Sequence, residues 1–393
     1  MFFLSHTEPL TLATLAPLLR GQDPVRLSPE TAHRLADSEA HLPRRPPQPA
    51  AQPRAAGRPP AEDVPDANLS EAEQAHWETN LLRSHAYGTG CEVPPSLVRL
   101  MLLLVARHSL RQPAGLALPT VERLLAFYNR ELLPVVYEQG GDSAALAHVV
   151  LPLLGKGAVN YQDYHLATPD ALSLFSWEPL SLRAGEVGAL RGGTPFTLAY
   201  AIDAVLRAQR LALAAAAVRA LLGEATDGNA FEPAPLLVAL RSVADAVDLA
   251  LEHSSAESLA PALGQLAAVI AALGQASAGR TAWLSAAPGA SGAATALATH
   301  NRAVGQSIAA ETDPYAAVRV RQMVETAEQL LGMELLAAAQ ALELGPAASL
   351  GGPLGALLAM FRKAVPIGDP DQAPSPALRQ AAAFVRDYAW TVL

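Results

Sequence analysis

The chain has 393 residues, of which 51% are hydrophobic and 17% are charged. This apolar content excludes a wholly disordered chain, which has too little apolar surface to offset the entropy of folding. The net charge of −9 argues against a nucleic-acid-binding protein, because such proteins neutralise phosphates with Lys and Arg. The single cysteine, Cys91, excludes an internal disulfide framework and a multi-cysteine metal site. We therefore expect neither a nucleic acid nor a metal ion as a partner.

The sequence contains neither a run long enough to span a membrane nor the features of a signal peptide. A transmembrane helix needs about 20 apolar residues, whereas the run Leu211–Val218 is bounded by Arg210 and Arg219. The N-terminal residues have no basic segment, and Glu8 interrupts the apolar run that a signal peptide requires. The sequence thus predicts a cytoplasmic protein with no membrane association.

The N-terminal part is predicted to consist of a helical segment and a linker. Residues 1–42 contain one or two short helices, one of which begins with Ser28 as the N-cap and Pro29 as the first helical residue. Between Pro43 and Pro65 there are eight prolines and four arginines. Proline removes backbone donors and breaks helices, so residues 43–67 are predicted to be a linker or a surface loop.

Residues 68–393 are predicted to form one helical-bundle domain. Ser70 and Glu73 form a capping box, which satisfies free N–H groups at a helix start. Three long helices are predicted at 194–223, 235–253 and 315–344. Such helices are typical of an all-α bundle. Because their surfaces carry few charges, we expect self-association as a dimer or tetramer.

Residues Asn80–Gly90 read Asn-Leu-Leu-Arg-Ser-His-Ala-Tyr-Gly-Thr-Gly and closely resemble a segment of the histidine and aromatic amino acid ammonia-lyases. Other similar blocks follow in that family's order: Leu10-Thr-Leu12, Leu27-Ser-Pro29, Pro134-Val-Val136, Asp142–His148, Gly155-Lys-Gly157, Glu186–Thr194 and Val324–Glu343. The resemblance implies the elongated all-α bundle of the ammonia-lyase (aspartase/fumarase-like) fold.

In that family an Ala-Ser-Gly tripeptide cyclises to a methylidene-imidazolone group (MIO), the electrophile that the reaction needs. At the corresponding place, before Asp142, this chain reads Glu138-Gln-Gly-Gly141 and has no serine. The family's nearby asparagine corresponds to Gly192, and the residues after Gln306 lack its Glu-Asp-His. The resemblance therefore implies a chain without the prosthetic group, and we expect no cofactor.

Two further parts of the family's site are missing. The segment with the catalytic tyrosine would lie where the proline-rich stretch is, and an arginine loop, a second tyrosine loop and one core helix would lie between Gly223 and Gly228. A literal Ala-Ser-Gly does occur at Ala290-Ser291-Gly292, far from the expected place. Small-residue tripeptides arise by chance in an alanine-rich chain, so an ordinary turn is expected there.

The residues that could still carry chemistry are inferred from the resemblance. His85 and Glu232 are the candidates for acid/base catalysis, since a histidine titrates near neutral pH. The candidates for substrate binding are Tyr87, Asp142, Asn229 and Gln306.

Each candidate also has a structural interpretation. His85 would fix the glycine-rich loop by hydrogen bonds, and Tyr87 would fill space left by the lost helix. Asp142 would cap a helix start, and Gln306 would tie helices together. His148, on an apolar helix face, is expected to be a satisfied core residue.

Two functions remain open. The first is a MIO-independent enzyme that performs acid/base chemistry (elimination, isomerisation or cyclisation) on an amino-acid-derived or aromatic small molecule. The second is a non-catalytic pseudoenzyme that acts as a scaffold or as the partner subunit of a related lyase in a hetero-oligomer. An ordinary MIO-dependent ammonia-lyase is not expected, because the serine is missing.

Overall fold

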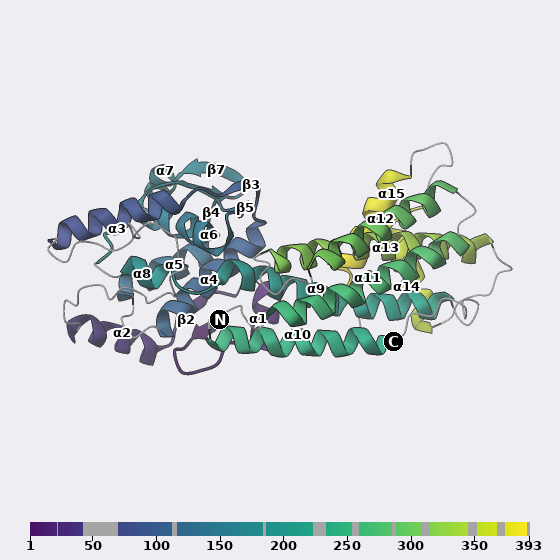
Figure 1. The fold of residues 1–393 in the computed structure, drawn as a ribbon, viewed down its shortest axis with the longest axis horizontal. Coiled ribbons are helices and arrows are strands. Elements are labelled where there is room, and N and C mark those ends of the chain that lie inside the picture. The colour runs from purple at the N-terminus through teal and green to yellow at the C-terminus, as the bar shows by residue number, and fades with distance from the viewer. Residues whose placement is uncertain are drawn as a thin grey trace, which may run out of the picture. The chain divides into compact units, whose positions relative to one another are not determined.

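The structure, a computed structural model, describes eleven segments of the chain: residues 1–21, 23–41, 70–111, 116–183, 186–222, 233–253, 259–284, 288–308, 315–344, 352–367 and 374–390. The predicted linker at 43–67, the region between Gly223 and Gly228, and the candidates Asn229 and Glu232 lie outside these segments. The chain divides into two compact units (Figure 1). Unit 1 contains residues 1–199 and 251–255, and unit 2 contains residues 200–250 and 256–393.

Unit 1 combines short helices with three small sheets. Its helices are α1 (Leu12–Arg20), α2 (Pro29–His41), α3 (Glu71–His85), α4 (Pro95–Arg111), α5 (Leu118–Arg130), α6 (Gly141–Val150), α7 (Thr168–Leu174) and α8 (Glu186–Leu190), with a 3₁₀ turn at Leu151–Leu154. Its strands are β1 (Phe2–Leu4), β2 (Val25–Leu27), β3 (Thr89–Glu92), β4 (Leu133–Pro134), β5 (Tyr137–Gln139), β6 (Ala158–Tyr161) and β7 (Tyr164–Ala167). β1 pairs with β2 in parallel, β3 pairs with β5 antiparallel, and β4, β6 and β7 form an antiparallel sheet. The sequence did not predict these strands, because none is longer than four residues.

The core of unit 1 is built around α4, whose residues from Leu100 to Leu110 are all buried. A helix that is apolar nearly all round is expected to lie inside a protein. Its buried Arg107 donates to the carbonyl oxygens of Ser5 and Glu8, each at 2.8 Å. These bonds satisfy a buried charge and attach the N-terminal residues to the core. The described residues of the predicted N-terminal segment 1–42 belong to unit 1.

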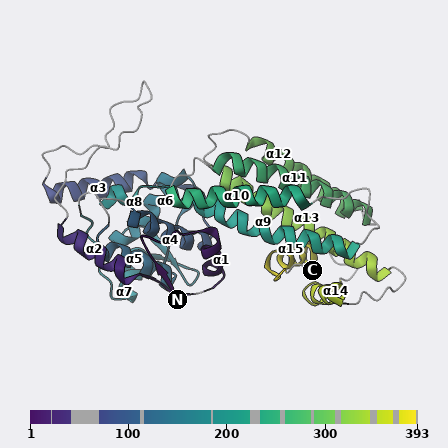
Figure 2. The ribbon, with the colours of Figure 1, turned by 90° about the horizontal axis from the view of Figure 1, so that it is seen from below.

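Unit 2 contains helices and no strands over the residues that the structure describes. Its helices are α9 (Pro195–Leu222, whose first five residues belong to unit 1), α10 (Pro233–His253), α11 (Leu259–Leu284), α12 (Pro288–Ser307), α13 (Ala316–Leu344), α14 (Gly352–Ala364) and α15 (Ser375–Asp387). α11 packs against both α12 and α13, and α13 packs against α15 (Figure 2).

Two arginines inside unit 2 have carboxylate partners on α13. Arg280 donates from Nε to Glu334 at 2.6 Å, and the two side chains are only 4% and 0% exposed. Arg207 likewise donates from Nε to Glu328 at 3.0 Å, and both residues are buried. Removing one partner of such a pair would leave an uncompensated buried charge, so each pair ties α13 to its neighbour.

The helical predictions from capping residues are confirmed. α2 begins at Pro29, and the backbone N–H of Thr31 donates to Ser28 Oγ at 3.2 Å. α3 begins after Ser70, whose capping box with Glu73 is formed. The all-α fold class is confirmed as well, with the small sheets of unit 1 as an addition.

The structure corrects the expectation for Ala290-Ser291-Gly292. These residues are not an ordinary turn but lie in the first helical turns of α12, which begins at Pro288. Proline favours the first helical position because its missing N–H is not needed there. The carbonyl oxygen of Ser291 accepts a hydrogen bond from Thr295 Oγ1 at 2.9 Å, the i to i+4 spacing of a regular helix.

Among the described helices, α11 is long and apolar enough to cross a membrane by length and composition alone. In the structure 44% of its most apolar window is buried, and it packs against α12 and α13. Core helices of water-soluble proteins meet the same criterion, so this helix is weak evidence for a membrane.

Candidate functional site

The glycine-rich loop after α3 lies beside the segment that corresponds to the family's MIO tripeptide. β3 follows the loop and pairs with β5, with Thr89 opposite Gln139. The hydroxyl of Thr89 donates to Gln139 Oε1 at 3.2 Å. Antiparallel pairing therefore positions residues 85–90 next to Gly140 and Gly141, at the start of α6.

The backbone at Gly140 leaves no room for a side chain. Its φ is +132°, which L-residues rarely adopt. A Cβ at this position would lie 2.6 Å from the Cβ of Ala144 and 3.4 Å from the Cα of Gly88. Gly140 occupies the place of the family's serine, so a serine side chain does not fit this backbone. The residues here do not fit the prosthetic group.

His85 has hydrogen-bond partners at both ring nitrogens, and Ser84 Oγ also lies 3.3 Å from its Nδ1. Its Nδ1 lies 2.8 Å from the carbonyl oxygen of Leu81, and its Nε2 lies 2.8 Å from a guanidinium nitrogen of Arg191. Arginine can only donate and a carbonyl can only accept. His85 is therefore neutral in this arrangement, with the proton on Nδ1 and the Nε2 lone pair directed at Arg191.

Arg191 is the residue that the sequence analysis missed. It connects α8 to the Gly192-Gly-Thr194 block, and none of the described carboxylates lies within ion-pair distance of its guanidinium. The sequence feature that could have identified Arg191 is its position directly before the Gly192-Gly-Thr194 block. Its role was not visible because His85 is 106 positions away in the sequence.

Asp142 caps a helix, as the structural interpretation predicted, but the helix is α9 rather than its own. Its Oδ1 accepts from the backbone N–H groups of Phe196 and Thr197 at 2.8 and 3.2 Å, and its Oδ2 accepts from Thr197 Oγ1 at 2.6 Å. Burial raises the pKa of the carboxyl group, although the hydrogen bonds from Thr197 and Phe196 oppose the shift. A carboxylate at this place satisfies the first N–H groups of α9.

The Gly192-Gly193 step packs against His108 of α4. A Cβ on Gly192 would collide with His108 Nε2, and one on Gly193 would lie 3.0 Å from its Nδ1. Burial lowers the pKa of His108. The imidazole thus fills the space that a side chain at position 192 would need, which gives a steric reason for glycine in place of the family's asparagine.

His148 is packed but not satisfied, which corrects the expectation of a satisfied core residue. Its ring meets Tyr137 edge to face, with a centroid distance of 5.3 Å. Nε2 is buried and has no hydrogen-bond partner within the described segments. Gly88 lies against this nitrogen, since a Cβ at that position would lie 3.0 Å from it. Burial lowers the pKa of His148, which favours the neutral imidazole.

The other candidates are not gathered around His85 by the described structure. Tyr87 is 60% exposed, so the interpretation that it fills space inside the chain is wrong. Gln306 is exposed near the end of α12 in unit 2 and forms no hydrogen bond within the described part of the chain, so it does not tie helices together there. In the same part, no three His, Cys, Asp or Glu residues are grouped as metal ligands.

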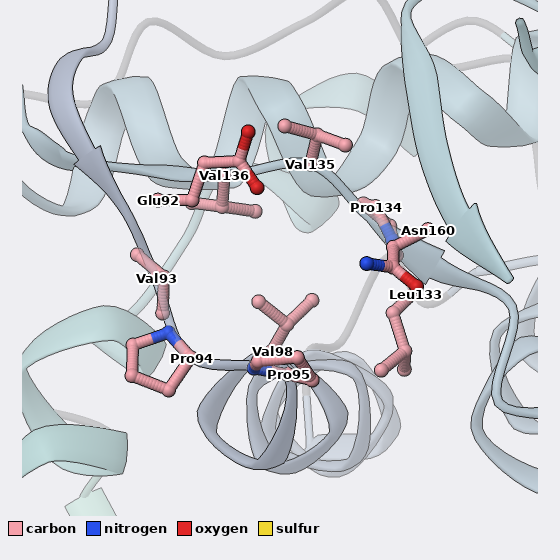
Figure 3. Close-up of a pocket in the computed structure, with 10 residues that line it drawn as sticks. All are labelled: Glu92, Val93, Pro94, Pro95, Val98, Leu133, Pro134, Val135, Val136 and Asn160. Atoms are coloured by element: carbon pink, nitrogen blue, oxygen red, sulfur yellow. The ribbon is translucent and has the colours of Figure 1, made fainter. Parts of the chain in front are cut away.

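A small cavity of about 90 Å³ lies between the end of β3, the start of α4 and the strands β4 and β6 (Figure 3). Glu92 and Asn160 lie on different sides of it, and valine, proline and leucine side chains form the rest of the lining. Glu92 is paired with His165 Nε2 at 3.2 Å. None of the four candidates within the described segments, His85, Tyr87, Asp142 and Gln306, lines this cavity.

Comparisons with known sequences agree with the resemblance. Residues 10–256 match the family described as aromatic amino acid lyase. The histidine ammonia-lyase of Geobacillus thermodenitrificans (strain NG80-2) is 39% identical over 168 residues, which are 42% of this chain and 33% of that protein. The histidine ammonia-lyase of Desulfotalea psychrophila (strain LSv54 / DSM 12343) is 32% identical over 200 residues, covering 48% and 39% of the two chains. The match thus spans little more than a third of these relatives.

Solved structures share the fold. Histidine ammonia-lyase from Trypanosoma cruzi superposes with a TM-score of 0.77 at 18% identity, covering 99% of this chain and 94% of the other. Tyrosine aminomutase from Streptomyces globisporus gives a TM-score of 0.79 at 17% identity, covering 98% and 96%. At this identity the similarity shows the fold alone. Because the family pattern covers more than half of the sequence, the chain belongs to the aromatic amino acid lyase family.

Proposed function

We propose that this chain is a MIO-independent member of its family that acts as a non-catalytic subunit, either as a scaffold or as the partner of a related lyase. The observation that carries the proposal is the backbone at Gly140, which has no room for the side chain that the prosthetic group requires. Without that electron sink, the family's elimination of ammonia has no route in this chain.

The hydrogen bonds of the retained loop support the non-catalytic role. Both ring nitrogens of His85 are engaged by Leu81 and Arg191, and both carboxylate oxygens of Asp142 are used at the start of α9. A general base needs an accessible lone pair directed at the substrate. In this arrangement His85 ties the end of α3 to Arg191, and Asp142 ties α6 to the start of α9, so both residues serve packing.

The absence of the prosthetic group is tested by intact-mass spectrometry together with an ammonium assay. We expect the encoded mass, and no ammonium release from histidine, phenylalanine or tyrosine. A mass lower by two water molecules, or steady ammonium release, would contradict the proposal.

The role of His85 is tested by His85→Ala. Under our proposal this change lowers the melting temperature or alters assembly, because α3 loses its bond to Arg191. A variant that melts like the wild type but loses a measured turnover would instead identify His85 as a catalytic residue.

One observation favours a second candidate function, acid/base catalysis on an amino-acid-derived or aromatic small molecule. Arg191 uses one guanidinium nitrogen for His85, which leaves further N–H donors beside it. Arginine binds carboxylates through two parallel hydrogen bonds, in a bidentate geometry. In this candidate Arg191 holds the ligand carboxylate and releases His85 as the base. Tyr87 would orient the ligand.

The second candidate is tested by measuring the melting temperature with 3-phenylpropanoate, an aromatic carboxylate. Stabilisation of the wild type that is lost in Arg191→Gln would favour it. An equal response of both proteins would leave Arg191 as a structural residue. Cytoplasmic location and homo- or hetero-oligomerisation are part of both proposals.

A further inference from the structure

A second, smaller cavity of about 10 Å³ lies in unit 1 where α4 meets the start of α9. Leucine side chains, Gly193 and Pro195 form its apolar lining, and Arg107, His108 and Thr194 are its polar residues. A cavity of this volume has room for one particle about as large as a water molecule. The chemistry of its polar residues therefore decides which particle that is.

Arg107 is a buried cation without a counter-charge in the described part of the chain. The residue is only 3% exposed. Its two terminal nitrogens donate to the carbonyl oxygens of Ser5 and Glu8, but Nε is buried and has no hydrogen-bond partner among the described residues. Carbonyl oxygens carry only a partial negative charge. Burial and the like charge of Arg111 both lower the pKa of Arg107, and no described carboxylate opposes them. Buried charges in proteins are normally paired.

Thr194 has a buried hydroxyl whose usual acceptor role is taken by another residue. The carbonyl oxygen of Thr194 accepts from the N–H of Leu198 at 2.9 Å, so Thr194 is the N-cap of α9. An N-cap threonine normally accepts from the backbone N–H two or three positions further on. Here Asp142 accepts from both of these groups, those of Phe196 and Thr197. The hydroxyl of Thr194 is left without a partner within the described segments and can donate into the cavity.

We propose that this cavity binds one chloride-sized monovalent anion between Arg107 Nε and the hydroxyl of Thr194. Both groups donate hydrogen bonds, and the ion supplies the counter-charge that the buried guanidinium lacks. A water molecule has a similar size but carries no net charge. Sulfate and phosphate have five heavy atoms and are too large. His108 adds no second positive charge, because burial lowers its pKa and favours the neutral imidazole.

The bound anion would connect three segments of unit 1. Arg107 lies on α4 and already holds the carbonyl groups of Ser5 and Glu8, whereas Thr194 begins α9. A ligand that binds the folded chain and not the unfolded chain stabilises the fold in proportion to its occupancy. Chloride therefore stabilises unit 1. This inference goes beyond the proposed function, because it holds whether or not the chain is catalytic.

Bromide tests the position of the ion, because it replaces chloride and gives an anomalous X-ray signal. Crystals of the full chain grown in sodium bromide should show an anomalous peak within hydrogen-bonding distance of Arg107 Nε and Thr194 Oγ1. Electron density for a water molecule at this place, without an anomalous peak, would overturn the inference.

The melting temperature tests the binding energy in solution. Sodium gluconate is replaced stepwise by sodium chloride at constant total salt, which keeps the screening of charges unchanged. The melting temperature of the wild type should rise with chloride as the binding relation requires, which gives an apparent dissociation constant. Thr194→Val removes the hydroxyl but keeps the side-chain shape and the bonds of Arg107. It should weaken chloride binding about ten-fold, the effect of losing one hydrogen bond to a charged group.

Thr281→Val is the matched control. Thr281 is also a buried threonine, but it lies on α11 in unit 2, and its hydroxyl donates to the carbonyl oxygen of Ser277. Its apparent dissociation constant for chloride should equal that of the wild type. Two results would contradict the inference: a wild-type melting temperature that does not depend on chloride, and a Thr194→Val response that equals that of the wild type or of Thr281→Val.

Discussion

At the scale of single residues, the site of this chain is governed by glycines that allow close backbone approach. Gly88 and Gly140 lie against each other, so the backbone at the start of α6 packs directly against the loop after α3. Where a relative would carry a serine at position 140, this chain has a positive φ and a contact with Ala144. Under our proposal, the tight packing and the missing prosthetic group are therefore two consequences of the same residue.

Gly140→Ser is expected to destabilise the chain and not to restore the prosthetic group. The side chain would collide with Ala144 and adopt a disfavoured φ, at a cost of about 3 kcal/mol or more in the free energy of unfolding. Urea denaturation measures the loss, and mass spectrometry should find no missing water molecules.

Gly141→Ser is the matched control for that substitution. Gly141 also has a positive φ, of +67°, but a Cβ there would meet nothing within 4 Å. Only the left-handed conformation is penalised, at about 1–2 kcal/mol. An equal loss in both variants would contradict the steric account of Gly140.

His148 is expected to make the chain sensitive to acid. Burial lowers its pKa in the folded state, so below the ordinary value near 6.5 the unfolded chain binds more protons than the folded chain. The stability that the neutral ring contributes is complete above that value and is lost as the pH falls through it towards the folded pKa. His148→Gln should flatten the decline in unfolding free energy between about pH 7 and 5, measured by urea titration. An unchanged slope would assign the acid sensitivity elsewhere, for example to His108, whose pKa is also lowered by burial.

At the scale of elements, Asp142 joins two helices, and it lies 54 residues before Phe196 in the sequence. At the start of α9, the backbone N–H groups of Phe196 and Thr197 both donate to this one carboxylate. A side chain from α6 therefore takes the role that a local Ser or Asp usually has at an N-cap. This contact between elements explains the retained Asp142 without any substrate.

Asp142→Ala is expected to lower the unfolding free energy by about 1–2 kcal/mol, the usual cost of losing an N-cap, and to affect α9 first. Asp142→Asn is the control, since its amide oxygen still accepts from the backbone N–H groups. Hydrogen exchange at Phe196 and Thr197 should become faster in the alanine variant and change less in the asparagine variant. Equal exchange in both variants would argue against the cap.

At the scale of the whole molecule, the chain consists of two compact units, each with its own buried core. Proteins with several cores commonly depart from two-state unfolding. We therefore expect the calorimetric enthalpy of unfolding to exceed the van't Hoff enthalpy of the same transition. A ratio of one would show that the units unfold as a single cooperative body.

The sequence by itself determined several helix starts, the three long helices at 194–223, 235–253 and 315–344, and the family blocks, because capping residues and apolar spacing act over a few neighbouring positions. Ser28, the Ser70–Glu73 box and the Thr194-Pro195 start were readable for that reason. Contacts between distant segments have no such local signal. Only the tertiary structure revealed Arg191 against His85, Asp142 at α9 and Gly140 against Ala144. Chain folding brings these groups together through packing of whole elements, which residue spacing does not encode.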